Sequence, residues 1–599
     1  MHSTKFVLCL KFNFKRMNKR TLYSLLFSIV ILSTALLSCK GKAKGGGTLN
    51  IRISADPDKL NPITLTTNDA RKVADLMFAA LNGSNPVPDY SLTPYIIKEN
   101  AKITEIKEGE YKGGIKLDYE IREDAKWDNG TPITSNDYVF TIKCILNPKV
   151  NCEPLRGYYS WLADIVVDSA NPLKFSVIAN KKYYMIEDFA GGYVMPEYNY
   201  DPEKIMRKFA IKDMNTDAKR SALRENADIN KFAMDFNSEK FQRDPAFITG
   251  AGPYRLESWT TGQELVLVKK DSWWGNAHAE DRTFWAFPKR IKVKIINDDN
   301  TAMTAMKDGS IDNYVAIKAK DFKELEKNET FKDKFNLSRI GRLGYSFLGI
   351  NLRNEKFQDV RVRKAMAHAV DRDKINEIIS FGESTKTESF AHSTQPHYNK
   401  NLKAYEFSPE KAAQLLDEAG WKDTDGDGFR DKVLNGKKTQ LVVEYKIPKD
   451  ETAKNQGLII QEGFKKVGID LKIVEKEWTI MVAELDKHQF EMYNMGFTIS
   501  PKMSDPKQQW HTSSAVPGGS NNVGWGDAAS DKLIEDIGAE LNLEKRQEMN
   551  KQLQQRVHDE VPVIFLFNPT NRIASSKKFE IENIMIAPGV LYNEFKTIK

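Results

Sequence analysis

The sequence lacks the local patterns that mark common hydrolase, metalloprotease and nucleotide-binding sites. It has no Gly-x-Ser-x-Gly, no His-Glu-x-x-His and no Gly-x-x-x-x-Gly-Lys-Ser/Thr segment. Histidine is scarce, with 8 in the 599 residues, and no two are spaced as a metal pair on one helix face. His392 and His397 flank a proline-containing loop, where a zinc pair is disfavoured. These absences argue against an enzyme of those classes and leave no predicted catalytic residue.

Long apolar runs are also missing. The apolar run from Leu22 to Leu37 carries no charge and is shorter than the roughly 20 residues that a membrane-spanning helix needs. Basic residues at positions 15, 16, 19 and 20 precede it, and Ser38, Cys39 and a Lys/Gly tract follow it. This order is typical of a secretory signal peptide. The sequence therefore predicts an exported chain without a permanent transmembrane helix.

The cysteine after this leader indicates a lipid anchor. Residues 36–39 (LLSC) resemble a bacterial lipobox, in which the cysteine is acylated and becomes the first mature residue. Several acyl chains on one residue hold a protein at a membrane more firmly than one chain does. We expect residues 1–38 to be the signal peptide, Cys39 to carry the lipid, and residues 39–47 to form a linker. An ordinary signal peptide cut beside a cysteine is the alternative, and Met17 is a second candidate start.

The excess of positive charge lies mostly in the predicted signal peptide. Six of the 89 Lys and Arg residues, and none of the 82 Asp and Glu residues, lie in residues 1–38. The basic pI of about 8.7 therefore reflects the leader, and it gives no support to a nucleic-acid partner. About 550 residues remain, which exceeds one hydrophobic core and predicts two or three domains.

Cysteine is rare in the rest of the chain, where only Cys144 and Cys152 occur. In an oxidising compartment they could form a disulfide, worth roughly 2–3 kcal/mol in the loop-entropy model. Two free buried thiols are the alternative, because the sequence does not give the Cα separation.

An Asp/Gly-rich stretch at 423–431 (DTDGDGFRD) has oxygen-bearing side chains at alternate positions. Asp423, Asp425 and Asp427 would be the ligands of a structural calcium loop. Position 12 of such a loop should be a bidentate Glu, and Leu434 stands there. A turn after a helix at 409–419 is therefore favoured, and no metal or other cofactor is predicted.

Hydrophobic periodicity predicts an α/β chain without a solenoid repeat. Expected strands lie at 48–54, 115–121, 254–256, 264–268, 291–295, 346–351 and 470–474. Expected helices lie at 69–81, 138–145, 301–306, 360–380 and 451–467. Residues 204–240 are highly charged with helical spacing, and we expect them to form an exposed insertion.

A series of local signatures resembles the family 5 extracellular solute-binding proteins of ABC importers, of the oligopeptide- and dipeptide-binding type. They appear in the family's order from about residue 47 to the C-terminus. In chain order they are 47–51 (GTLNI), 56–62 (DPDKLNP), 119–134 (YEIREDAKWDNGTPIT), 250–254 (GAGPY), 273–275 (WWG), 309–312 (GSID), 357–365 (FQDVRVRKA), 520–522 (SNN) and 561–563 (VPV). One such motif would be weak evidence, and the ordered series is strong.

The resemblance implies a two-lobed, class II periplasmic-binding-protein-like fold with a third domain, built from mixed β-sheets flanked by helices. The first lobe is expected to comprise residues 48–78, 165–320 and 557–599. The additional domain would be residues 79–164, and the second lobe residues 321–556. Such a receptor encloses its ligand between the lobes by hinge closure.

The resemblance also implies ligand-binding positions. In oligopeptide-binding members, an aspartate in a Trp-x-x-Asp-Tyr pattern binds the amino terminus of the peptide. The matching stretch here is 497–501 (FTISP), so Phe497 takes the aromatic position, Ser500 replaces the aspartate, and Asp505 follows after an apparent insertion. A buried ammonium without a carboxylate costs several kcal/mol. Either Asp505 takes the role, or the ligand is not a peptide with a free amine. The other expected ligand contacts are Thr67, Asn68, Trp478 and Asn521.

The function implied is that of a receptor, lipid-anchored to the cell envelope and facing the periplasm. As a monomer it would capture a solute, with an oligopeptide preferred, and deliver it to the permease of an ABC importer. One alternative is an anchored hydrolase acting on peptides or glycans. Another is a structural or signalling lipoprotein without a ligand.

Overall fold

The computed structural model describes residues 47–85 and 91–598, which belong to one compact unit, residues 47–599. The predicted signal peptide and the lipid-bearing Cys39 lie outside the described residues. Within the described part, no helix has the length and apolar character needed to cross a membrane.

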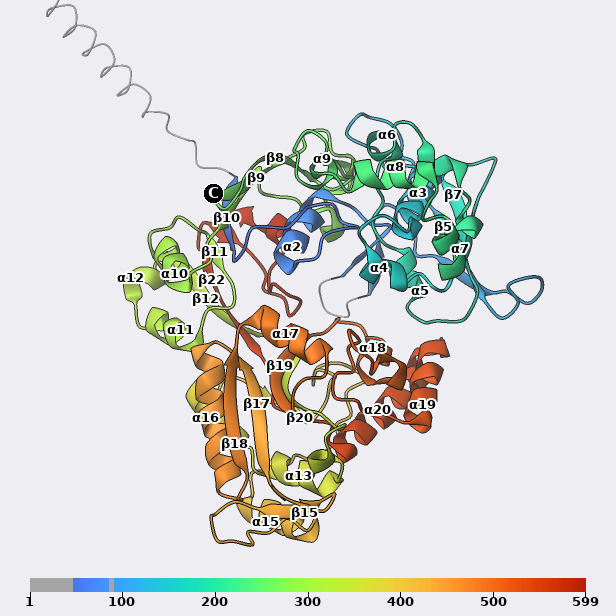
Figure 1. Ribbon diagram of the computed structural model, residues 1–599. Coiled ribbons are helices and arrows are strands. Elements are labelled where there is room, and N and C mark those ends of the chain that lie inside the picture. The colour runs from blue at the N-terminus through green and yellow to red at the C-terminus, as the bar shows by residue number, and fades with distance from the viewer. Residues whose placement is uncertain (1–46, 86–90, 599) are drawn as a thin grey trace, which may run out of the picture. The chain divides into compact units, whose positions relative to one another are not determined.

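The largest sheet has seven strands, drawn from three separated parts of the chain (Figure 1). In spatial order they are β12 (Phe335–Gly341), β22 (Thr570–Ser576), β11 (Asn313–Tyr314), β1 (Thr48–Ile53), β10 (Arg290–Ile295), β9 (Glu264–Lys269) and β8 (Tyr254–Thr260). β1 runs parallel to both of its neighbours, with Thr48 beside Arg290. Its alternate residues Leu49, Ile51 and Ile53 are buried, which confirms the predicted strand.

A five-stranded sheet forms a second core. Its order is β18 (Asp470–Lys476), β17 (Val442–Pro448), β19 (Met492–Thr498), β13 (Gly344–Ile350) and β20 (Val563–Phe565). β17 and β18 are parallel, and α16 (Glu451–Lys465) connects them and packs against both (Figure 1). The buried face of α16 presents Ile460 and Phe464 to the same core as Val443 and Tyr445.

A smaller antiparallel sheet contains β4 (Lys102–Glu105), β5 (Ile115–Glu120), β7 (Lys174–Ala179) and β6 (Leu162–Val167). The helix α3 (Ser135–Leu146) packs beside it, with Tyr138 over Phe175 at 4.7 Å between ring centroids. Asp137 accepts a hydrogen bond from the Thr134 amide (2.9 Å) and caps α3, which contains the helix predicted at 138–145 and begins before it, at Ser135.

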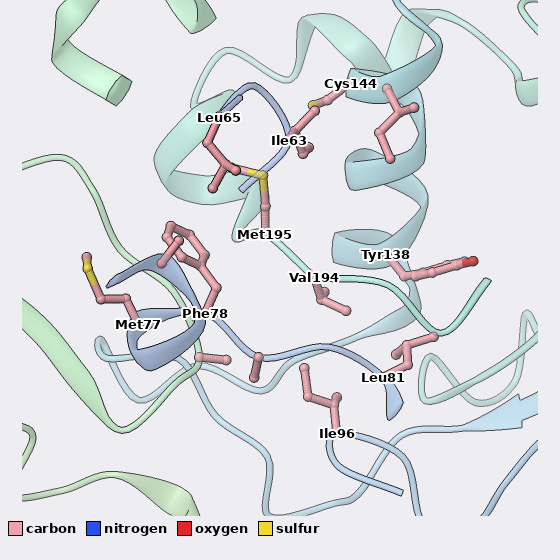
Figure 2. Close-up of a cluster of buried hydrophobic side chains, with 14 of the residues drawn as sticks. Ile63, Leu65, Met77, Phe78, Leu81, Ile96, Tyr138, Cys144, Val194 and Met195 are labelled. Atoms are coloured by element: carbon pink, nitrogen blue, oxygen red, sulfur yellow. The ribbon is translucent and has the colours of Figure 1, made fainter. Parts of the chain in front are cut away.

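The core of the seven-stranded sheet continues into this region. Figure 2 shows Met77 and Phe78 at the end of α2 (Asn68–Met77), Tyr138 and Cys144 from α3, and Met195 in one buried cluster. The other long helices are α8 (Ala227–Phe236), α10 (Asp299–Lys307), α11 (Ala319–Glu326), α13 (Val360–His368), α14 (Arg372–Ser380), α15 (Pro409–Glu418), α17 (Trp478–Asp486), α19 (Ala528–Ala539) and α20 (Leu543–Glu560).

The strand order disagrees with three predicted domain limits. The limit between 164 and 165 divides β6, whose partner β7 lies in the same four-stranded sheet. The limit at 320 separates β12 from the seven-stranded sheet to which it belongs. The limit at 557 places β20 with the first lobe, whereas β20 pairs with β13 of the five-stranded sheet. Residue patterns predict strands better than they predict the sheet that a strand joins.

Two local predictions were wrong. Residues 204–240 are more than an exposed insertion, because α8 buries Phe232 and Phe236 against Phe140 and Tyr200. The helix expected over 360–380 is two helices, α13 and α14. The second begins where the Asp371 side chain accepts a hydrogen bond from the Lys374 amide (2.9 Å).

Cys144 and Cys152 are free buried thiols, so the disulfide alternative is wrong. The Arg156 guanidinium organises the loop between them and donates hydrogen bonds to the carbonyls of Ile145 (2.8 Å) and Val150 (2.6 Å). It also contacts the Cys152 sulfur at 3.4 Å, and that thiol donates to Ile145.

Candidate functional site

A cavity of about 300 Å³ lies where four distant parts of the chain meet. The first part, residues 158–189, contains the end of the four-stranded sheet and α5 (Ile186–Ala190). The second, residues 498–509, leaves β19 and enters α18 (Lys507–Trp510). Residues 390–397, with Asn550 of α20, complete the lining. Its volume is at the lower end of the range for small-ligand pockets.

Aromatic rings form one wall of this cavity. Phe189 stacks on Tyr158, with ring centroids 4.9 Å apart and an interplanar angle of 22°. It also lies nearly parallel to Tyr183 at 6.4 Å. Such rings offer rigid apolar area at a small entropic cost, which suits a ligand with apolar side chains or an extended backbone.

Asp505 supplies a carboxylate to the cavity. Its Oδ2 accepts a hydrogen bond from the Tyr183 hydroxyl (2.8 Å), and its Oδ1 accepts one from the Lys507 amide (2.8 Å). Within the part of the chain that the structure describes, Asp505 forms no ion pair. Lys502, which also lines the cavity, is paired with Asp188 at 2.7 Å. A cationic group of a ligand would therefore find Asp505 as its counter-charge.

His397 lines the cavity as a neutral side chain. It is buried, with 6% of its surface exposed. Burial lowers the pKa of His397 to about 4, and the nearby positive charges of Arg546 and Lys551 act in the same direction. At neutral pH the imidazole therefore contributes hydrogen-bonding groups without a charge.

The loop that carries Ser500 is held by a buried glutamine. Gln395 Nε2 donates hydrogen bonds to the Ser500 carbonyl (2.9 Å) and the Pro501 carbonyl (3.1 Å). The Ser500 side chain is exposed, and its hydroxyl accepts a hydrogen bond from the Lys502 amide (3.2 Å). It thus shapes the turn beside the cavity, while Asp505 itself lines the cavity.

Phe497 lies next to the cavity and not in its wall. It stacks on Phe347 with ring centroids 5.4 Å apart at 25°, in the core between β13 and β19. A smaller cavity of about 20 Å³ borders it, and Gln509 lines both cavities.

Thr67, Asn68 and Trp478, like Phe497 and Ser500, are not among the residues that line the cavity. Thr67 caps α2: its hydroxyl accepts a hydrogen bond from the Ala70 amide (3.2 Å) and donates one to Asp58 (3.0 Å). Asn68 is the exposed first residue of that helix. Trp478 begins α17 with 55% of its surface exposed. Their role in binding stays a prediction.

Asn521, another predicted ligand contact, makes its side-chain hydrogen bonds within the protein. Its side chain is fully buried. Both amide hydrogens are donated to carbonyls, those of His511 (3.1 Å) and Trp525 (2.8 Å). Its oxygen accepts from the amides of Gly524 and Trp525, both at 3.2 Å. With every polar group engaged, Asn521 fixes its own loop.

The Asp/Gly stretch forms a turn, as favoured. Asp423 accepts hydrogen bonds from the amides of Gly426 (2.7 Å) and Gly428 (3.0 Å), and Asp427 accepts one from the Phe429 amide (2.8 Å). Among the described residues, the one group of side chains near enough to share a metal is Asp423, Asp425 and Asp431, without the predicted Asp427. The Lys438 ammonium lies 2.7 Å from Asp425 and 3.3 Å from Asp431, so it already supplies the positive charge.

Sequence reasoning missed Tyr183 and Gln395 altogether and considered His397 only as a zinc ligand. Tyr183 lies 322 residues from Asp505 along the chain, so no local pattern could connect them. A weak signal existed in residues 181–184 (KKYY), where adjacent aromatic residues follow a strand.

Comparisons with known proteins bear on the family and the fold of the chain. The oligopeptide-binding protein AppA of Bacillus subtilis (strain 168) is 25% identical over 581 residues, which cover 94% of this chain and 96% of AppA. The solved structure of AppA with a nonapeptide has a TM-score of 0.69 at 23% identity and covers 92% of this chain and 99% of its own. The periplasmic EDTA-binding protein EppA has a TM-score of 0.73 at 16% identity, with 92% and 97% covered.

These structures confirm the predicted fold class, an α/β, periplasmic-binding-protein-like fold with mixed sheets flanked by helices. The model of the bacterial extracellular solute-binding proteins, family 5 Middle, matches residues 108–519. Because this match spans more than half of the chain, the protein belongs to the family 5 bacterial extracellular solute-binding proteins.

Proposed function

We propose that the chain is a lipid-anchored receptor that captures an oligopeptide through its free amino terminus and delivers it to an ABC importer. Its family consists of solute-binding proteins, which supports a binding role without catalysis. Similar proteins include AppA with a nonapeptide and an oligopeptide-binding protein of Thermus thermophilus with a pentapeptide. They also include EppA and a Brucella suis NikA with Fe(III)-EDTA, so family membership alone does not select the ligand.

The observation that favours a peptide amine is the carboxylate of Asp505. It lines the cavity, forms no ion pair among the described residues, and follows closely after Ser500, which replaces the expected aspartate. A terminal ammonium of a ligand would pair with this carboxylate through charge-assisted hydrogen bonds. We therefore assign to Asp505 the role that Ser500 cannot fill.

The receptor would capture its ligand because the ligand contacts both lobes at once. A solute held by residues of both lobes stabilises the closed arrangement by its difference in affinity for the two states. The permease would then recognise the closed receptor. A lipid on Cys39, with the Gly/Lys linker behind it, would keep the monomeric receptor near that permease on the periplasmic side of the membrane.

The test compares Asp505→Asn with the wild type by calorimetric titration of a pentapeptide. We expect the variant to bind about 30-fold more weakly, a loss of about 2 kcal/mol, because it removes the counter-charge of the ammonium. Asp333→Asn is the matched control, since Asp333 is an exposed carboxylate outside the cavity lining. Equal peptide affinity of the wild type and Asp505→Asn would show that Asp505 does not bind the peptide amine.

Three further measurements address the ligand and the alternatives. Mass spectrometry of the natively purified protein identifies a co-purifying ligand. Turnover of peptides or glycans by the purified protein would support the anchored hydrolase. A ligand at 100 times its Kd should stabilise the fold by about 2.7 kcal/mol, so a Tm unchanged by every peptide pool would support the structural or signalling lipoprotein.

A further inference from the structure

The loop that carries Asp505 is held by the segment that follows β7. Three contacts join residues 183–188 to residues 502–505. The Tyr183 hydroxyl donates to Asp505 Oδ2 (2.8 Å), and the Lys502 ammonium donates to Asp188 Oδ1 (2.7 Å). The Tyr184 hydroxyl donates to the Met503 carbonyl (3.2 Å). All three occur beside the cavity, and Tyr183, Lys502 and Asp505 line it.

The contacts differ in the charges and hydrogen-bond acceptors that remain available to a ligand. In the Lys502–Asp188 pair, each charge already has its partner. In the Tyr183–Asp505 pair, the single hydroxyl proton is donated, and the phenolic oxygen keeps its acceptor capacity. No group among the described residues donates to that oxygen. Each carboxylate oxygen of Asp505 accepts one hydrogen bond and has room for another.

This arrangement matches a primary ammonium, which has one positive charge and three N–H donors. We propose that Tyr183 is a specificity-determining residue whose phenolic oxygen, together with the Asp505 carboxylate, accepts the N–H groups of a ligand's primary amine. Burial and the adjacent Asp505 charge raise the pKa of Tyr183, which keeps the phenol protonated and donating to Asp505. The inference rests on the proposed function, because it assigns part of the same amine site.

The consequence is selection for N–H donors as well as for charge. An N-acetylated peptide has lost the charge and presents one N–H. A peptide with a trimethylated amine keeps the charge and has no N–H. Because Tyr183 and Asp505 come from distant parts of the chain, a primary amine would also tie the segment 183–188 to the loop 502–505.

The experiment measures the affinities of one peptide in its free-amine, N-acetyl and N-trimethyl forms by calorimetric titration. The wild type is expected to bind the free amine at least about tenfold more tightly than either modified form, since hydrogen bonds to charged groups are strong. In Tyr183→Phe, which removes only the hydroxyl, the advantage of the free amine over the trimethyl form should fall about tenfold.

Two controls make the outcome specific. Asp188→Asn breaks the neighbouring ion pair and should weaken all three forms by the same factor, because it loosens the loop without touching the amine site. Tyr111→Phe removes a phenolic hydroxyl elsewhere, at a residue outside the cavity lining, and should change none of the affinities. Thermal unfolding checks that each variant is folded.

Each failure has a distinct signature. If the wild type prefers the free amine over the N-acetyl form but binds the trimethyl form equally well, or if Tyr183→Phe keeps the wild-type ratios, the Tyr183 assignment is overturned while the amine receptor stands. If the wild type binds free-amine and N-acetyl peptides equally, or neither, the proposed function fails and the inference fails with it. Equal wild-type affinity for the free-amine and trimethyl forms would overturn the assignment even if Tyr183→Phe does not fold.

Discussion

Acidification should destabilise the fold through His397. The pKa of this buried imidazole is lowered to about 4, against 6.5 for the free side chain, because burial and the charges of Arg546 and Lys551 oppose protonation. Between these two pKa values the unfolded chain binds the proton and the folded chain does not, so the free energy of unfolding falls as the pH falls. The contribution is complete at neutral pH, about 2 kcal/mol is lost at pH 5, and about 3 kcal/mol is lost below pH 4.

The variant His397→Gln tests this magnitude, because it keeps a polar side chain and removes the titration. Urea unfolding at about pH 8 and about pH 5 should show a pH-dependent loss of stability that is about 2 kcal/mol smaller in the variant. NMR titration of isotope-labelled histidine, with the variant assigning the signal, should give a midpoint near pH 4 for His397. A midpoint near 6.5, or the same pH dependence in both proteins, would refute the reasoning.

Three further outcomes can be checked on the purified protein. Phe497→Ala should lower the free energy of unfolding, measured by urea titration, by about 2–3 kcal/mol, because a stacked, half-buried ring is lost. A change under about 0.5 kcal/mol would contradict the position of Phe497 in the core. Cys144 and Cys152 should react with a thiol reagent only after unfolding, since burial raises the pKa of both thiols, that of Cys152 to about 11; fast native labelling would contradict this. Added calcium should leave Tm unchanged, because the Lys438 ammonium already forms an ion pair with Asp425. A rise in Tm would support the calcium-loop alternative.

Regular elements were predictable where one face of a strand or helix meets a core. The alternation of β1 identified that strand within a residue, and hydrophobic spacing identified α3 within three residues. The break between α13 and α14 was not predictable from glycine or proline, because neither occurs there. It depends on Asp371 capping a second helix, a choice that packing against the five-stranded sheet settles.

Sequence reasoning could predict only some of the residues of the candidate site. Asp505 could be named because its segment follows a strand and resembles a known binding motif. Its partner Tyr183 and the loop support from Gln395 could not be named, since each contact joins residues more than a hundred positions apart. The motif around Asn521 suggested a ligand contact, and the structure shows the side-chain hydrogen bonds of Asn521 serving its own loop.

The replacement of the expected aspartate by Ser500 explains why this loop needs so many supports. Moving the carboxylate from position 500 to Asp505 takes it away from the end of β19 and places it on an irregular segment. A carboxylate on a mobile loop would lose affinity, because binding would have to order that loop at an entropic cost. Gln395 fixes the start of the segment, and Tyr183 with Asp188 fixes its end before any ligand arrives. Preorganisation by these distant residues therefore replaces the rigidity that the strand would have given. Under the proposed function, Tyr183 would both bind the amine and support the loop.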